Sequence, residues 1–151
     1  MNRQVHTIFC DDIRQEVGGK LSYIGVYSEK MLVSPIPSVL PKLCLALSVI
    51  TPLALPFCKL SARVLKNDDE LVKREFAEAE LLAFNSAIAG LKDDERVDRV
   101  QIFRFQFFFS PFSIDAPCTL KVRVDTGEDE LRGMGLLIEQ APPRLPESQA
   151  R

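Results

Sequence analysis

The chain has 151 residues, of which 46% are hydrophobic and 26% charged, a composition typical of one globular domain rather than a disordered chain. Its formal net charge is −2, and the 19 basic residues are spread among 21 acidic ones. This balance gives no reason to expect binding to nucleic acid or to an anionic membrane, because neutralising phosphates needs a basic stripe.

The sequence also indicates no passage through a membrane. Residues 1–9 contain charged and polar side chains where a signal peptide needs an apolar core, so we expect no secretion and a cytoplasmic location. The most apolar stretch, Leu40 to Leu60, is interrupted by three prolines and two lysines. A membrane-spanning helix needs about 20 unbroken apolar residues. Two adjoining buried strands explain this stretch better.

The N-terminal part predicts two strands joined by a glycine turn. Residues 5–9 and 20–27 have the composition of strands. Gly18-Gly19 favours a tight turn, because glycine reaches positive φ without a Cβ clash. We therefore expect a hairpin that pairs residues 12–16 with residues 20–24.

The middle of the chain predicts a central strand followed by a second hairpin. Residues 43–51 are apolar on both faces, as in a strand that is covered on both sides. Residues 57–65 alternate between apolar and polar side chains, and Asn67-Asp68-Asp69 predicts the next turn. The apolar row of this second strand is Cys58, Leu60, Ala62 and Val64.

Residues 70–90 leave two interpretations open. The stretch is rich in Glu, Ala, Leu and Lys, which favour a helix that begins at Glu70. The same residues can instead continue the preceding hairpin as its return strand. We favour a strand to about Glu80, followed by a short helix or loop to Gly90.

Three later segments, at 100–109, 118–125 and 131–140, also alternate with period two. A helix would scatter the phenylalanines of the first segment around its axis, whereas a strand stacks them on one face. In the last segment, Gly133 and Gly135 indicate a bulge or a close backbone approach. The predicted core rows are Phe103, Phe105, Phe107 and Phe109; Cys118, Leu120, Val122 and Val124; and Met134, Leu136 and Ile138.

About eight such strands predict a mainly β fold, namely a two-layer antiparallel β-sandwich of the immunoglobulin-like or C2-like kind. We expect at most one short helix, near 78–90, and a single sandwich domain over residues 1–141. The tail, 142–151, has three prolines and no apolar pattern, so we expect it to be disordered. The phenylalanine row is interpreted as core and not as a platform for nucleic-acid bases, because basic residues are not interleaved with it.

One acidic cluster is a candidate for chemistry. Asp11, Asp12 and Glu16 lie close in sequence to His6, and carboxylates beside a turn can bind a hard cation. Their spacing matches no Ca²⁺ loop, so a solvated turn or an ion pair with Arg14 is the simpler interpretation. A single histidine without a defined nucleophile is weak support for acid–base catalysis.

Other motifs predict no cofactor. The stretch Gly18 to Ser22 lacks the spacing and the hydroxyl position of a phosphate-binding loop. The cysteines form no C-x-x-C pair, so we expect free thiols that serve as small apolar fillers, and no zinc site. These cysteines are Cys10, Cys44, Cys58 and Cys118.

Residues 8–27, IFCDDIRQEVGGKLSYIGVY, resemble the opening of a family of small bacterial proteins of unknown function. The resemblance implies a cytoplasmic, all-β protein with no established activity, and it transfers no catalytic residues. The Glu- and Ala-rich middle of this chain departs from the family's pattern. The matching positions are Asp11, Asp12, Ile13, Arg14, Glu16, Gly19, Lys20, Ser22, Ile24, Gly25, Val26 and Tyr27.

The same motif has a structural interpretation. A three-residue loop, 17–19, sets Glu16 opposite Lys20 and Arg14 opposite Ser22, which gives polar cross-strand pairs. A two-residue loop would shift the register and lose those pairs.

These observations favour a non-catalytic protein-binding or assembly module, which uses a sheet face or edge to engage a protein partner or a second copy. Two alternatives stay open: a phage- or prophage-associated structural or host-interaction protein, and a metal-dependent hydrolase centred on the acidic cluster at 6–16. We expect no catalytic, cofactor or metal residues. The possible interaction residues are Asp11, Asp12, Arg14, Glu16, Lys20 and Ser22.

Overall fold

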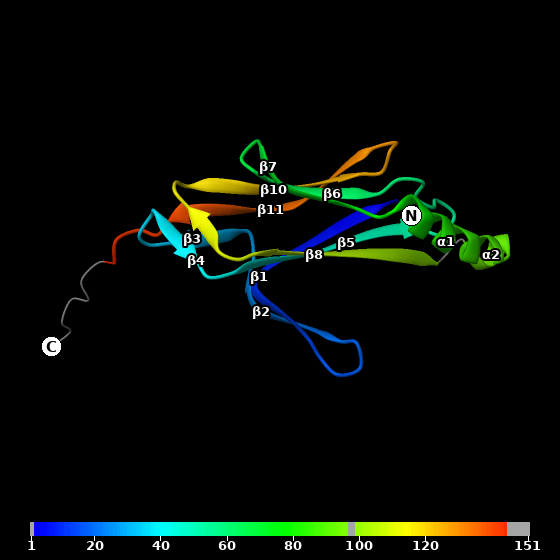
Figure 1. The fold of residues 1–151 in the computed structure, drawn as a ribbon, viewed down its shortest axis with the longest axis horizontal. Helices are drawn as coiled ribbons and strands as arrows, with labels where there is room; N and C mark the ends of the chain where they lie inside the picture. The colour runs from blue at the N-terminus through cyan, green and yellow to red at the C-terminus, as the bar shows by residue number, and fades with distance from the viewer. Residues whose placement is uncertain (1, 97–98, 145–151) are drawn as a thin grey trace.

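Two β-sheets lie face to face and enclose the main apolar core (Figure 1). The architecture is that of a computed structural model, which describes residues 2–96 and 99–144. Two short helices, α1 (Glu78–Ala89) and α2 (Asp93–Arg96), lie at one end of the sheets. The strands are β1 (Gln4–Gln15), β2 (Leu21–Tyr27), β3 (Lys30–Val33), β4 (Ser38–Leu40), β5 (Leu43–Pro52), β6 (Ser61–Lys66), β7 (Asp69–Glu75), β8 (Val100–Phe109), β9 (Phe112–Ile114), β10 (Cys118–Asp125) and β11 (Glu130–Gln140).

The first sheet, sheet A, has the order β2-β1-β5-β8, and the second, sheet B, has the order β3-β11-β10-β6-β7. The predicted two-layer, mainly β sandwich with a short helix near 78–90 is confirmed. The prediction that all strands pair antiparallel is wrong at one edge of sheet B, where β3 runs parallel to β11. β3 is also the strand at which the chain passes from β2 in sheet A to sheet B.

The phenylalanines of β8 form the aromatic centre of the core. Phe103, Phe105 and Phe107 are buried and Phe109 is half-buried, as predicted for a row on one face of a strand. The ring of Phe76 meets the rings of Phe103 and Phe105 edge-on, with centroids 5.1 and 5.0 Å apart. Edge-to-face pairs of this kind add to the free energy gained by burial.

The strand predicted for 57–65 begins later than expected, at Ser61. Residues 53–60 form a loop, and Cys58 in that loop is exposed instead of joining the core row. Phe57 nevertheless stays fully buried in the main core, where its ring meets that of Phe103 edge-on with centroids 5.5 Å apart. Its backbone carbonyl also accepts a hydrogen bond of 2.9 Å from the Asn85 amide on α1. The loop is therefore anchored to the core by a side chain and not by sheet pairing.

Residues 67–90 follow the favoured order of a hairpin and then a short helix, but the strand ends at Glu75 and the helix begins at Glu78, so the strand predicted to about Glu80 is too long. Asn67 adopts a positive φ of 55° in the turn, and Val64 of β6 pairs with Val72 of β7. An unbroken helix from Glu70 is wrong, because sheet pairing extends through β7 before α1 begins.

The glycines of β11 mark a bulge, as predicted. Val122 faces Gly133 and Leu120 faces Leu136, so β11 contains one more residue than β10 between these pairs. An extra residue reverses which side chains face the core. The predicted core position of Met134 is therefore wrong: its side chain is 65% exposed, whereas Leu136 and Ile138 are buried.

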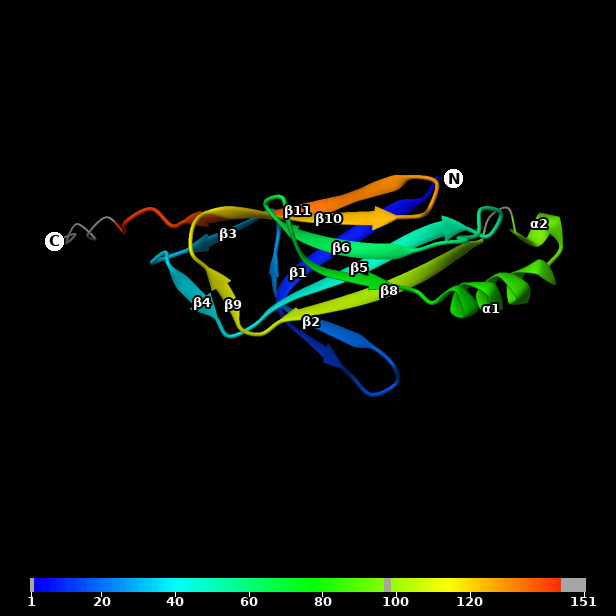
Figure 2. The ribbon, with the colours of Figure 1, turned by 45° about the horizontal axis from the view of Figure 1, so that its top comes forward.

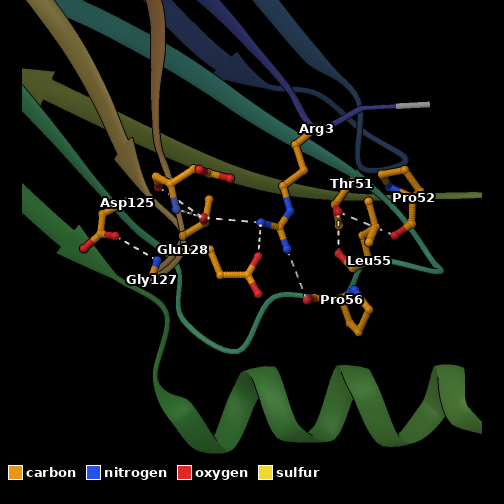
Figure 3. A network of polar contacts seen from close by, with 10 residues as sticks. Arg3, Thr51, Pro52, Leu55, Pro56, Asp125, Gly127 and Glu128 are labelled. Atoms are coloured by element: carbon orange, nitrogen blue, oxygen red, sulfur yellow. Dashed lines mark hydrogen bonds and ion pairs between the residues drawn. The ribbon is translucent and has the colours of Figure 1, made fainter.

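Arg3 closes the end of the sandwich beside α1 (Figure 3). The side chain is 11% exposed, and its guanidinium contacts Glu128 at 3.0 Å and the Pro56 carbonyl oxygen at 3.5 Å. The guanidinium carbon also lies 4.7 Å from the centroid of the Phe57 ring. These contacts join the start of β1 to the loop between β5 and β6 and to the loop between β10 and β11.

Three short strands were not predicted from the sequence: β3, β4 and β9, of which β4 and β9 pair only with each other among the described strands. Among the described residues, no helix is long and apolar enough to cross a membrane. The disorder predicted for 142–151 falls mostly outside the described residues, which end at 144.

The buried phenylalanines generate a first prediction. Phe105→Ala or Phe107→Ala is expected to lower the free energy of unfolding by about 3–5 kcal/mol in urea titrations, because each leaves a cavity in the core. Phe108→Ala is the matched control on the opposite face of the same strand, where the ring is 47% exposed; it should cost about 1 kcal/mol or less. Equal losses at all three positions would contradict the assignment of faces.

The bulge generates a second prediction. A Cβ atom at Gly135 would lie 2.3 Å from the backbone oxygen of Leu120, so Gly135→Ala is expected to destabilise the fold by about 1–3 kcal/mol. At Gly90 the nearest atom would be 3.9 Å away and the backbone is αR, so Gly90→Ala should be neutral or stabilising. Thermal and urea unfolding would measure both, and a harmless Gly135→Ala would refute the close approach.

Candidate functional site

The candidate site is built on the hairpin of β1 and β2, which projects from the sandwich (Figures 1 and 2). The first part of β1 pairs with β5, and its last part pairs only with β2. We call the projecting residues 11–26 the arm. The predicted three-residue loop is confirmed, since Arg14 pairs with Ser22 and the Glu16 N–H donates to the Lys20 carbonyl over 2.8 Å.

A bend separates the arm from sheet A. The register runs from the pair Cys10–Val26 to the pair Asp12–Ile24 and omits Asp11 and Gly25 between them. Gly25 has a φ of 65°, and a Cβ there would lie 2.1 Å from Asp11 Oδ2. Glycine is therefore required at this position on two grounds, its backbone conformation and the close carboxylate.

The bend turns the arm back over the outer face of sheet A. Ile13 packs with Cys10, Cys44 and Ala46 in a small buried cluster separate from the main core. Leu21 and Tyr23 of β2 and Ile8 of β1 are partly buried against it. The arm is thus held in place by apolar contacts, which an isolated two-stranded hairpin lacks.

Asp11 is engaged by the far end of β2. The hydroxyl of Tyr27 donates to Asp11 Oδ1 over 2.5 Å. Partial burial, together with this hydrogen bond and the charge of the carboxylate, raises the pKa of Tyr27. Tyr27 therefore stays protonated and serves as a hydrogen-bond donor at the base of the arm.

Asp12 is engaged by two cations. Lys42 Nζ lies 2.5 Å from Asp12 Oδ1, and Arg14 Nε lies 3.2 Å from Asp12 Oδ2. The hydrogen bond from Lys42, and then that from Arg14, lower the pKa of Asp12. The predicted ion pair with Arg14 is confirmed, whereas Lys42 was missed; its only sequence signal is a lone charge just before the apolar strand β5.

The thiols beneath the bend act as fillers. Cys10 and Cys44 face each other across β1 and β5, and their sulfurs contact the carbonyl oxygens of Asp12 at 3.4 Å and Asp11 at 3.7 Å. Burial, followed by the neighbouring Cys44 and Asp11, raises the pKa of Cys10 to about 11, so its thiol is protonated and unreactive near neutral pH. The filler prediction fits the three buried cysteines and is wrong for Cys58, which is exposed.

The other predicted interaction residues do not join this cluster. Glu16 and Lys20 lie opposite each other at the exposed tip, but within the described residues their side chains form no ion pair. His6 is exposed on the part of β1 that pairs with β5. Within residues 2–96 and 99–144, no three His, Cys, Asp or Glu side chains are grouped to hold a metal ion.

An open cleft of about 420 Å³ lies between the arm and β8. The arm contributes Gln15, Gly19, Leu21 and Tyr23, and the outer face of β8 contributes Arg104 and Gln106. This lining offers amide, phenol and guanidinium donors, which suits hydrogen bonding to a polar chain more than chemical catalysis.

Comparison with known proteins adds no family to these observations: no family model, no curated protein and no solved structure matches this chain. The resemblance of the opening motif to a family of unknown function therefore stays a prediction, as does the immunoglobulin-like or C2-like type of sandwich.

The pair of Asp12 and Lys42 generates a third prediction. Because folding lowers the pKa of Asp12 from its ordinary 3.8, the ionised carboxylate stabilises the fold fully above that pH, and this contribution is lost as pH falls through the lower folded value. Lys42→Met should raise the pKa of Asp12 toward 3.8 in a carboxyl NMR titration. Lys59→Met, which removes an ion pair with Asp125, is the control that leaves Asp12 unchanged. An unaltered Asp12 titration in Lys42→Met would disprove the contact.

Proposed function

We propose that this protein is a non-catalytic protein-binding module, which captures an extended segment of a partner protein along β2 of the arm. The proposal is carried by the apolar side chains that the arm leaves in solvent. Val17 at the tip is 95% exposed, and Ile24 and Val26 on β2 are 40% and 57% exposed. Apolar side chains gathered on a projecting element are typical of an interaction site.

The edge of β2 suits the addition of a strand. β2 pairs with β1 on one side only, and its sequence, LSYIGVY, contains no charged residue. Proteins usually protect such edges with charges, prolines or a covering segment. A partner strand would satisfy the free backbone groups of β2 and cover Ile24 and Val26, as in recognition by strand addition.

The contacts at the base of the arm support a positioning role over a catalytic one. The carboxylates of Asp11 and Asp12 are already bonded to Tyr27, Lys42 and Arg14. A metal-dependent hydrolase would have to break these contacts to free its ligands. The same contacts hold the arm at a fixed angle, which lowers the entropy lost when a partner binds.

The fourth prediction tests capture by β2. The double variant Ile24→Lys/Val26→Lys places two charges on the exposed surface of the strand and is expected to lose a partner that the wild-type protein captures from a lysate of the source organism. The loss should be at least tenfold in affinity, because each buried unpaired charge is costly.

The matched control is Leu82→Lys on α1, where the side chain is 58% exposed and lies outside both sheets. This variant should bind the partner as the wild type does. Circular dichroism and thermal unfolding establish that all variants fold. A partner that is retained by Ile24→Lys/Val26→Lys, or lost equally with Leu82→Lys, would refute the assignment to β2.

A further inference from the structure

The free edge of β8 is the longest unpaired strand edge among the described residues. Sheets A and B end in β2, β8, β3 and β7. β3 has four residues, and five of the seven residues in β7 are charged. β8 has ten residues and carries one charge, that of Arg104. Short or charged edges resist pairing with another chain, whereas a long and mostly apolar edge invites it.

The hydrogen-bond pattern shows which residues of β8 present backbone groups at this edge. The Leu53 N–H donates to the Arg99 carbonyl over 3.0 Å, and the register continues without a shift through Pro52–Val100 to Leu43–Phe109. Because hydrogen-bonded pairs alternate along an antiparallel ladder, the odd-numbered residues of β8 bond to β5. The even-numbered residues therefore direct their N–H and C=O groups outward.

The outward-directed residues also carry the outer side chains of the strand. Ile102 and Phe108 are 41% and 47% exposed, and Arg104 and Gln106 lie between them. The sequence of outer positions is thus apolar, polar, polar, apolar. A strand with this pattern is self-complementary when it pairs with a copy that runs in the opposite direction.

We propose that two copies of this chain associate through their β8 edges in antiparallel register, with Phe105 on the two-fold axis. In this register Arg104 of each copy lies opposite Gln106 of the other, and Ile102 lies opposite Phe108. Moving the axis to Arg104 would set two arginines against each other, and moving it to Gln106 would set Arg104 opposite Phe108. The axis at Phe105 alone pairs polar with polar and apolar with apolar side chains.

The charges around this edge are compatible with the pairing. Lys42 lies 5.5 Å from the centroid of the Phe108 ring, but its charge is paired with Asp12. Arg74 on β7 lies 5.9 Å from the Phe107 ring, toward one end of the paired segment and away from the axis. Two four-stranded sheets then form one continuous sheet with a closed, isologous interface.

The test uses charges at the two polar positions and measures dimerisation by sedimentation equilibrium. Gln106→Glu sets a glutamate opposite Arg104 twice per dimer and should tighten the dimer Kd roughly tenfold at low salt, whereas Gln106→Arg should weaken it roughly tenfold. The double variant Arg104→Glu/Gln106→Arg restores opposite charges and should dimerise as Gln106→Glu does. Urea unfolding of each variant separates weak pairing from a damaged fold.

A cross-linking experiment tests the register. In a Cys58→Ser background, Arg104→Cys and Gln106→Cys chains are mixed with glutathione disulfide, which accepts the two electrons and two protons of the thiols as they join. The mixture should form a disulfide between the two kinds of chain, because directly opposite residues have Cα atoms about 5.5 Å apart. Either variant alone should cross-link far less, since identical positions lie on a longer diagonal.

A wild-type chain that stays monomeric at millimolar concentration would overturn the proposal. A dimer whose Kd is the same in Gln106→Glu and Gln106→Arg as in the wild type would also overturn it. A dimer abolished by Ile24→Lys/Val26→Lys but not by Gln106→Arg would place the contact on β2 instead. The dimer and partner capture by the arm are tested separately, because Ile24→Lys/Val26→Lys should lose the partner protein and keep the dimer.

Discussion

Strand β5 has apolar side chains on both of its faces, and each face has to be covered. Leu45 and Leu47 face sheet B and are buried in the main core, while Cys44 and Ala46 point the opposite way. Sheet B can cover only one of these faces. The other is covered by Ile13, which the bend in β1 carries back over it. The arm therefore lies over sheet A because the central strand β5 is apolar on both faces and both faces are buried.

The same constraint explains why polar contacts gather at the bend. The chain turns sharply at Asp11 and Gly25, where ladder pairing is interrupted. Tyr27 bonds the carboxylate of Asp11 at that interruption, and Lys42 bonds that of Asp12 directly after it. Such exposed contacts contribute little to stability by themselves, but they select one orientation of the hairpin. The acidic cluster, which the sequence offered as a candidate for chemistry, therefore fixes the position of the arm.

Local patterns predicted most of the fold. The phenylalanine row and the glycine loop needed only side-chain periodicity and turn chemistry, and both are found in the structure. Met134 was misplaced because one extra residue in a bulge reverses the alternation, and periodicity cannot show where the reversal falls. The strands β3, β4 and β9 have only three or four residues, too few to establish a period.

The candidate site was predictable only in part, for a related reason. Asp12 and Arg14 are two residues apart on one strand, and their ion pair was predicted from the sequence. The hydrogen bond between Tyr27 and Asp11 was not predicted, because it depends on the interruption of the ladder at Asp11 and Gly25. Lys42 reaches Asp12 from the start of β5, 30 residues away. That contact depends on the angle of the bend, and the bend depends on packing that no local pattern encodes.

The strand order of sheet A places β2 and β8 at opposite ends of one sheet. Joining two copies through β8 leaves the outer edge of β2 unpaired in each copy, so the joined sheet carries two arms. Such an assembly is bivalent, so it can bind a partner that contains the recognised segment twice or that is itself a dimer. Once the first segment is bound, the second binds at a high effective concentration. Weak capture by a single arm then suffices for durable attachment.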